Sequence, residues 1–292
     1  MTTSALTVAT ADPSGRLGTR RLPLGRALRE PGLVLAVAYL GLVLLAALAP
    51  NVLTTWDPVT DVDPAASLSA PSAEHWFGTD ALGRDVYSRV VHGANLSITA
   101  GLLAVSISLV VGVLAGVVSG YVGRWADSTI MRVMDVMIAI PGLLLSLAFV
   151  SILGFGVVNV AIAVGIAGIP GFARLARAET LRLRNLAYVD AARCSGSGSA
   201  RIIVRHIVPG AGTAVVVLAA LEIGGAVLAV SALSFLGFGA VPPTPEWGSM
   251  VNEGRSHIAS AWWLTTFPGA AIAATVLACN RISRAVRVAG RS

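Results

Sequence analysis

The hydrophobic positions along this chain of 292 residues fall into six long runs that are separated by polar segments. Five of the runs contain no charged residue, and the remaining one contains only Glu222. A helix that crosses a bilayer needs about 20 mostly apolar residues, so the pattern predicts six transmembrane helices. The runs are Pro31–Pro50, Leu96–Gly120, Val136–Leu153, Val157–Ala173, Ala211–Phe235 and Ile258–Asn280.

Pro-Gly pairs interrupt two of these runs, at Pro141-Gly142 and at Pro170-Gly171. Proline removes a backbone donor and clashes with the preceding turn, and inside a membrane the freed carbonyls must be satisfied by neighbouring protein. We expect both pairs to bend their helices as packing features. The segment 51–95 is polar and rich in proline, and is expected to be a loop with short helices.

Five tryptophans lie in or beside the segments predicted to face outward. Amphipathic rings at such places usually sit at the level of the lipid headgroups, and we expect that position for Trp56, Trp76, Trp247, Trp262 and Trp263.

Composition points to a membrane protein as well. The chain is 55% hydrophobic and only 12% charged, against about 25% charged residues in soluble domains. All 21 basic residues are arginine. A phosphate loop of the Walker type needs a lysine, so this chain cannot form one. The predicted fold class is an all-α integral membrane protein. We expect it to lie in the lipid bilayer and to bind no nucleic acid.

The arginines are divided unequally between the two sides of the predicted helices. Eighteen lie on one side, and three lie on the other side together with eight acids. Arginine marks the cytoplasmic side, so both termini are predicted to be cytoplasmic. The expected order is a cytoplasmic tail (1–30), a first transmembrane helix (31–50), an extracytoplasmic segment (51–95), a transmembrane core (96–280) with a cytoplasmic connection at 178–210, and a second tail (281–292).

The first helix has one competing interpretation. Ala47-Leu48-Ala49 resembles a signal-peptidase site after an apolar run. The polar region before that run is long for a signal peptide, and we expect the helix to be retained.

Catalytic and metal-binding patterns are missing from the sequence. The four histidines and two cysteines form no metal or redox spacing, so no catalytic and no metal residue is predicted. Glu222 is the one acid deep in a predicted span, where a charge costs roughly 2.5–3.5 kcal/mol and must face protein or water. It is either a pore-lining or proton-relay group, or a structural carboxyl hydrogen-bonded across a helix interface. Since no second acid completes a relay, the structural role is favoured.

The cytoplasmic connection contains an organised polar stretch, YVDAARCSGSGSARIIVRHIVP (188–209). Residues 178–192 have helix-forming composition, and Gly196 permits a sharp reversal. A second short amphipathic helix follows, with 202–204 on one side, and Pro209 is expected to end it. Two short helices that meet at a glycine predict a rigid projection. A solvated loop is the alternative, and the small residues Ala191 and Ala192 favour docking.

This stretch resembles the Glu-Ala-Ala loop of permease subunits in bacterial ATP-binding-cassette importers. The matching residues are Asp190, Ala191, Ala192, Gly196, His206 and Pro209, with aspartate where the family usually has glutamate. In that family the loop forms coupling helices that fit a groove on the ATPase subunit.

Longer stretches resemble the second permease of the dipeptide, oligopeptide and nickel group: HWFGTDALGRDVYSRVVHGANLSI (75–98), RVMDVMIAIPGLLLSLAFV (132–150), IPGFARLARAETLRLRNLAYVDAA (169–192) and LSFLGFGAVPPTPEWGSM (233–250). The chain departs from the group at Val230, where an acid is common, and in its basic C-terminal end.

The resemblance implies a permease of the type I importer fold in the bacterial inner membrane. It implies a homologous second permease as partner, one or two ATPase subunits that use ATP and magnesium, and an extracytoplasmic substrate-binding protein. No cofactor is expected on this chain itself. The expected cargo is a dipeptide or oligopeptide, and nickel or another small solute is the alternative within the group. Pro242, Pro243, Glu246 and Trp247 are expected near the outer mouth or the binding-protein contact.

Two other classes rank well below this one. A self-contained channel or secondary transporter would move cargo alone and usually shows an inverted repeat, which is not visible here. An intramembrane enzyme would need a partner for Glu222 within the spans.

Overall fold

The computed structural model describes residues 30–289, with side chains to Ala285. The predicted tail 1–30 therefore lies, apart from Glu30, outside the described residues. The helices are α2 (Pro31–Leu48), α3 (Val86–Val122), α4 (Arg124–Ala139), α5 (Gly142–Leu153), α6 (Val157–Leu183), α7 (Ala187–Cys194), α8 (Ser199–Ile202), α9 (Val208–Leu233), α10 (Trp247–Gly254) and α11 (Trp263–Ala289). Short 3-10 turns cover Pro50–Val52, Pro64–Ala66 and Arg255–His257, and π-helical turns cover Ile203–Ile207 and Ser234–Phe238.

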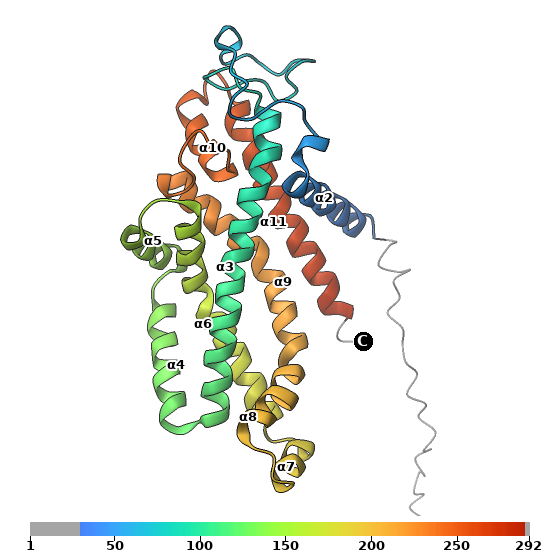
Figure 1. Ribbon diagram of the computed structural model, residues 1–292, viewed down its shortest axis with the longest axis vertical. Helices are drawn as coiled ribbons and strands as arrows, with labels where there is room; N and C mark the ends of the chain where they lie inside the picture. Colours follow the sequence, from blue (N-terminus) through green and yellow to red (C-terminus); the bar gives the residue numbers. More distant parts are fainter. Residues whose placement is uncertain (1–29, 290–292) are drawn as a thin grey trace, which may run out of the picture.

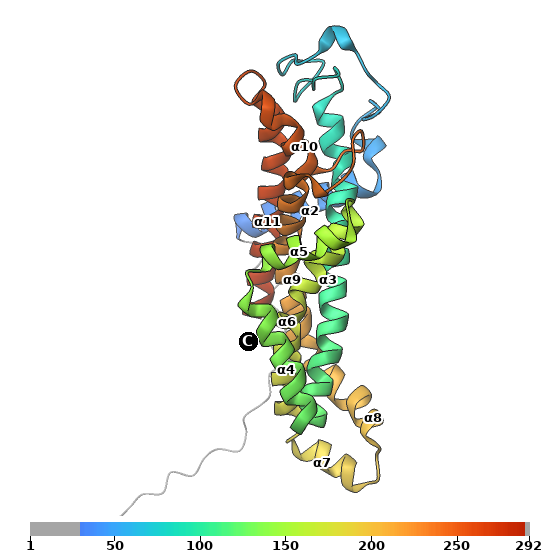
Figure 2. The same cartoon turned by 90° about the vertical axis from the view of Figure 1, so that its left-hand side faces the viewer.

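Five of these helical segments are long and apolar enough to cross a membrane, and the bent pair α4–α5 makes a sixth if it counts as one span. The long helices α3, α6, α9 and α11 run along the long axis of the molecule, and α2 crosses them obliquely (Figures 1 and 2). This all-helical arrangement agrees with the predicted fold class.

Helices α3 and α6 form the tightest pair because glycines let their backbones approach. A Cβ atom on Gly116 would lie 2.3 Å from the carbonyl oxygen of Ala173, and one on Gly112 would lie 2.6 Å from the Cβ of Phe172. The hydroxyl of Ser108 donates across the same interface to the carbonyl oxygen of Gly165 at 2.6 Å. Small residues and short hydrogen bonds of this kind hold helices together in lipid, where apolar surface gains little from helix contact.

The third predicted run is broken rather than bent. Helix α4 ends at Ala139, and α5 begins at Gly142 at an angle of 97° to it. Ile140 is extended, with φ −95° and ψ 130°, as expected for a residue before proline. Pro141 therefore ends one helix and starts the next. Pro170, in contrast, stays inside α6.

Pro209 does not end the second short helix, contrary to the prediction. Residues Ser199–Phe238 form one helical segment of 40 residues, whose backbone departs from the helix only at Gly237, near its end. Pro209 lies in the first turn of α9, where its missing N–H is tolerated, and the π-helical turn Ile203–Ile207 carries the chain into it. The predicted connection 178–210 is therefore helical over most of its length.

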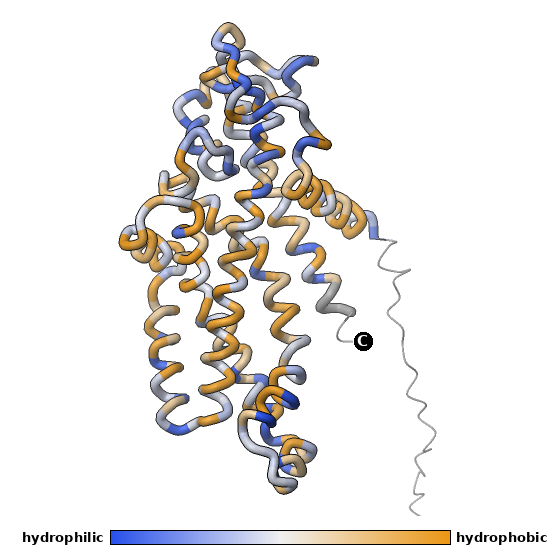
Figure 3. The backbone as a smooth tube through the Cα atoms, viewed as in Figure 1, coloured by the Kyte–Doolittle hydropathy of each residue, from blue (hydrophilic) through white to orange (hydrophobic). Residues whose placement is uncertain are grey.

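The polar residues gather at the two ends of the molecule. Helices α7 and α8 lie at one end, and the segment 51–85 with α10 lies at the other (Figure 1). Hydrophobic positions dominate the length between them (Figure 3). This is the separation that the predicted orientation requires, with the arginine-rich connection on the cytoplasmic side.

Candidate functional site

The first candidate site is the projection formed by residues 187–207, which we call the elbow. Helix α7 is followed by a reversal at Gly196, whose φ of +80° favours glycine. The reversal is closed by backbone bonds from the amides of Ser195, Gly196 and Ser197 to the carbonyls of Ala191, Arg193 and Ala192, at 2.9, 3.1 and 3.1 Å. The corner is thus fixed by its own hydrogen bonds.

Buried side chains anchor the elbow to the membrane helices. Val189 and Ile207 are 0% exposed and Ile202 is 1% exposed, and they pack in one cluster with Leu183 of α6 and Ala211 of α9. Val204, which was predicted on the same side as Ile202, is 70% exposed. The segment is helical, so residues two positions apart point to nearly opposite sides. Ile202 and Ile207 face the interior, and Val204 faces outward.

The residues of the predicted coupling motif lie together at this end of the molecule. Asp190, Ala191, Gly196 and Pro209 are exposed, and Ala192 and His206 are half-buried. Their docking role is not tested by the structure of this chain and stays a prediction.

Asp190 pairs within its own helix. Its Oδ1 accepts from Nη1 of Arg193 at 3.1 Å, and both side chains are more than half exposed. An exposed pair of this kind contributes roughly 0.2–1 kcal/mol. The pair can therefore be exchanged for an external partner at little cost.

A second ion pair braces the helices above the elbow, and sequence reasoning missed it. Arg177 of α6 donates from Nε and Nη2 to both carboxylate oxygens of Asp127 on α4, at 2.5 and 2.7 Å. Arg184 donates to the carbonyl oxygen of Gly120 at 2.7 Å. In the sequence these arginines served only to assign orientation, because nothing local marks a pair 50 residues apart.

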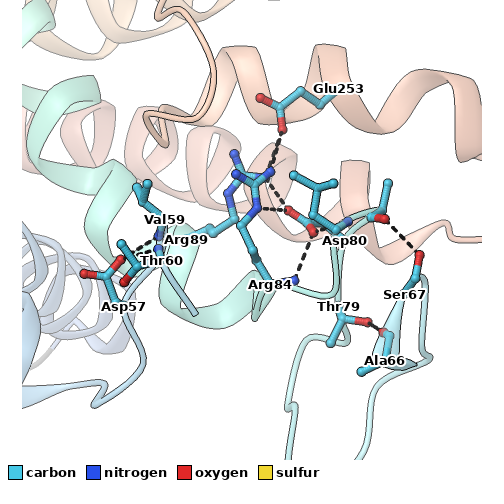
Figure 4. Close-up of polar contacts among 12 residues, drawn as sticks. Asp57, Val59, Thr60, Ala66, Ser67, Thr79, Asp80, Arg84, Arg89 and Glu253 are labelled. Atoms are coloured by element: carbon cyan, nitrogen blue, oxygen red, sulfur yellow. Dashed lines mark hydrogen bonds and ion pairs between the residues drawn. The ribbon is translucent and has the colours of Figure 1, made fainter. Parts of the chain in front are cut away.

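The second candidate site is the outer cap, which we define as residues 51–85 together with α10. Its centre is a charge cluster drawn in Figure 4. Oδ2 of Asp80 accepts from Nε of Arg84 at 2.7 Å and from Nη1 of Arg89 at 2.8 Å. Nη1 of Arg89 also donates to Oε2 of Glu253 on α10 at 2.9 Å. The cluster joins the loop, α3 and α10.

Both arginines of this cluster are nearly inaccessible, at 5% exposed for Arg84 and 2% for Arg89. Removing one member of a buried ion pair leaves an uncompensated charge and typically costs 3–5 kcal/mol. The motif at 75–98 thus has a structural function in fastening the cap. In the sequence this motif served only as a family resemblance, and its arginines served only to assign orientation.

Further contacts fold the cap onto the bundle. Asp85 caps α3 by accepting from the amide of Ser88 at 2.6 Å, and Nε1 of Trp263 donates to the carbonyl oxygen of Thr79 at 3.1 Å. At the rim, Asp57 accepts from the amides of Val59 and Thr60 (Figure 4). The Thr60 amide, with that of Val59, holds the pKa of the Asp57 carboxyl below its ordinary value.

Two of the residues predicted near the outer mouth are buried. Glu246 accepts from the amides of Gly248 and Ser249 at 3.0 and 2.9 Å and so caps α10. Its side chain is 0% exposed, and burial raises the pKa of Glu246 despite these amides. Trp247 is 1% exposed and its Nε1 donates to the carbonyl oxygen of Val90 at 2.8 Å.

The predicted headgroup position is therefore wrong for Trp247 and for Trp263, which is 4% exposed. Both rings pack in the protein core instead, because each indole N–H has a carbonyl partner there. Pro242 and Pro243 are exposed. They are therefore the two predicted residues that are accessible for a contact at the outer mouth or with the binding protein, and that role stays a prediction.

Glu222 lies on the face of α9 that borders a cavity shared with α3, α5 and α6. Its carboxylate makes no hydrogen bond or ion pair with the residues that the structure describes, and its side chain is exposed. The favoured structural role, a hydrogen bond across a helix interface, therefore finds no partner in the described part of this chain.

Comparison with known proteins decides what kind of molecule this is. The model of the family described as binding-protein-dependent transport system inner membrane component matches residues 112–289. The chain belongs to this family. The matched region includes the elbow and Glu222. The segment 51–85 of the outer cap lies before the matched region.

Two relatives that match this inner-membrane transport component over most of their length are permeases. A glutathione transport system permease protein GsiD of Pectobacterium atrosepticum is 41% identical over 262 residues, 90% of this chain and 87% of that protein. A dipeptide transport system permease protein DppC of Alkalihalophilus pseudofirmus is 42% identical over 256 residues, 88% of this chain and 83% of that protein. The resemblance to peptide-importer permeases is confirmed.

The fold of this transport component is shared with a solved importer. An inward-facing structure of the MetNI methionine ABC transporter matches with a TM-score of 0.54 at 19% identity, over 68% of this chain and 96% of that chain. This match confirms the predicted importer-permease fold. The family of inner-membrane components, together with the apolar helices, confirms the multi-pass location in the inner membrane.

Proposed function

We propose that this chain is one of two permease subunits of an ATP-driven importer for short peptides. The permeases GsiD and DppC, whose names give glutathione and dipeptides as cargo, support the substrate class. ATPase subunits that bind ATP and magnesium lie beneath, a binding protein delivers cargo from outside, and a homologous second permease completes the path. The observation that carries the proposal is the elbow, which is anchored by buried side chains and exposes its motif at the end of the molecule assigned to the cytoplasm.

The elbow is suited to transmit force because it is continuous with a span. The helical segment Ser199–Phe238 runs without interruption from the second arm of the elbow through α9. A displacement of the elbow therefore moves α9, which carries Glu222, as one body. Closure of the ATPase dimer would push the elbow and rock the spans between inward-open and outward-open arrangements.

Reconstitution tests this function directly. The chain is purified with its second permease and ATPases, placed in liposomes, and supplied with a binding protein and labelled dipeptide or glutathione. Uptake is expected only with all chains and ATP. Uptake by this chain alone, driven by a gradient, would contradict the proposal and favour a secondary transporter.

Asp190 tests the elbow within the same assay. Asp190→Ala is expected to lower peptide uptake and peptide-stimulated ATP hydrolysis together, and Asp190→Glu to restore both, because glutamate keeps the charge. Glu179→Ala is the matched control, since the one ion pair of Glu179 among the described residues is with Arg182 on its own helix. Wild-type coupling in Asp190→Ala would show that the motif acid has no coupling role.

A further inference from the structure

The cavity beside Glu222 has a volume of about 250 Å³ and is bordered by four helices. Its lining is made of small and apolar side chains with three polar ones, which are Ser108, Ser146 and Glu222. Gly142 and Leu143, at the start of α5 directly after the break at Pro141, lie on its wall. The break and the small side chains together leave the hollow.

The side chains of this cavity offer hydrogen-bond acceptors and no donors. The hydroxyl of Ser108 donates its proton to the carbonyl oxygen of Gly165 at 2.6 Å, and that of Ser146 donates to the carbonyl oxygen of Gly142 at 2.9 Å. Both hydroxyls therefore turn only oxygen lone pairs to the cavity. The carboxylate of Glu222 accepts only.

A set of acceptors around one negative charge fits a primary ammonium group. Such a group carries one positive charge and three N–H donors and has no acceptor. A carboxylate in a membrane span must face protein or water, and no residue of this chain that the structure describes pairs with Glu222. A hollow with room for a small solute favours cargo over a flat contact with another helix.

We propose that Glu222 receives the terminal ammonium group of the peptide cargo as it passes this cavity. The proposal rests on the proposed function and names the contact that the cargo makes. The ammonium group is common to linear peptides whatever their side chains, so recognition at Glu222 does not require a particular sequence.

A zero-length cross-link tests this contact without relying on transport. A carbodiimide joins a carboxylate to an adjacent amine, so the assembled complex is treated with it in the presence of peptide-loaded binding protein and a non-hydrolysable ATP analogue. Mass spectrometry is expected to find the peptide attached at Glu222. The same peptide with an acetylated amino terminus is expected to give no adduct there. If the peptide with a free amino terminus gave no adduct at Glu222, the proposal would be overturned.

Glu222→Gln gives the functional test in the complete complex. Loss of a charge-assisted hydrogen bond is expected to lower peptide uptake about tenfold or more, while the subunits still purify together. Glu179→Gln removes a carboxylate outside the cavity and is expected to leave uptake unchanged. Two results would instead identify Glu222 as an interface residue. One is loss of the second permease from the complex of the Glu222→Gln variant. The other is a carbodiimide cross-link between Glu222 of the wild-type chain and an amine of that second permease.

The two levels of failure are distinguishable. A wild-type complex that moves no peptide refutes the proposed function. A wild-type complex that moves peptide while Glu222→Gln moves it equally well refutes only the role of Glu222.

Discussion

Ile202→Ala tests whether the elbow is held by its buried cluster. Ile202 is 1% exposed and packs with Val189 and Ile207, apart from the main core between the spans. Truncating a buried isoleucine to alanine typically costs 2–5 kcal/mol. Since the elbow cluster has only five buried members, we expect the cost to appear as local opening of the elbow while the spans remain folded.

Hydrogen–deuterium exchange measures that opening. At the lower cost of about 2 kcal/mol the opening equilibrium rises about 30-fold. The amides of Ser195, Gly196 and Ser197 close the corner, and they should exchange faster by about that factor or more. Under the proposed function, peptide uptake should fall in parallel, because a loosened elbow would transmit less of the movement of the ATPases.

Val204→Ala is the matched control. Val204 lies two positions further along the same segment and is 70% exposed, so its truncation should change exchange by about twofold at most. The reasoning is refuted if Ile202→Ala leaves both exchange and uptake at wild-type values, or if Val204→Ala opens the corner to the same extent.

Three further predictions concern the rest of the molecule. Gly116→Ala should destabilise the complex by about 1–3 kcal/mol, because the new Cβ would lie 2.3 Å from a carbonyl oxygen of α6. Gly41→Ala is the control, since nothing lies within 4 Å of a Cβ there, and it should leave stability unchanged. The melting temperatures of the two variants test this difference. Asp80→Asn should destabilise the outer cap by about 3–5 kcal/mol, measured by denaturation against the exposed Asp57→Asn, and equal melting of the two would contradict the cluster's importance. Since burial raises the pKa of Glu246, folded protein holds that proton more tightly than unfolded chain, and this contribution to stability falls as pH rises. The melting temperature of Glu246→Gln relative to wild type should therefore rise from acid to neutral pH, and a flat or falling difference would reverse the assigned direction.

The spans and the elbow could be predicted from sequence because they depend on local patterns. Long apolar runs give helices in a membrane, and the glycine at Gly196 gives the reversal. The break at Pro141 was predicted only as a bend, since sequence does not tell whether a proline stays inside its helix, as Pro170 does, or separates two helices.

The outer cap could not be predicted because its contacts join distant residues. Arg89 and Glu253 are 164 positions apart and meet only through the packing of α3 against α10. For the same reason Trp247 reads as a membrane-surface ring in the sequence but packs in the core, where Val90 accepts its indole proton. Burial that depends on tertiary contacts leaves no periodic signal.

Thiol labelling of Cys194 tests the central claim on the native chain. Cys194 lies exposed at the end of α7, and Cys279 is buried, so a membrane-impermeant maleimide should modify the elbow selectively. The account predicts labelling in inside-out vesicles and none in intact spheroplasts, with the rate strongly reduced once the ATPase subunits are bound. Labelling from the outer face, or a rate that the ATPases leave unchanged, would contradict it.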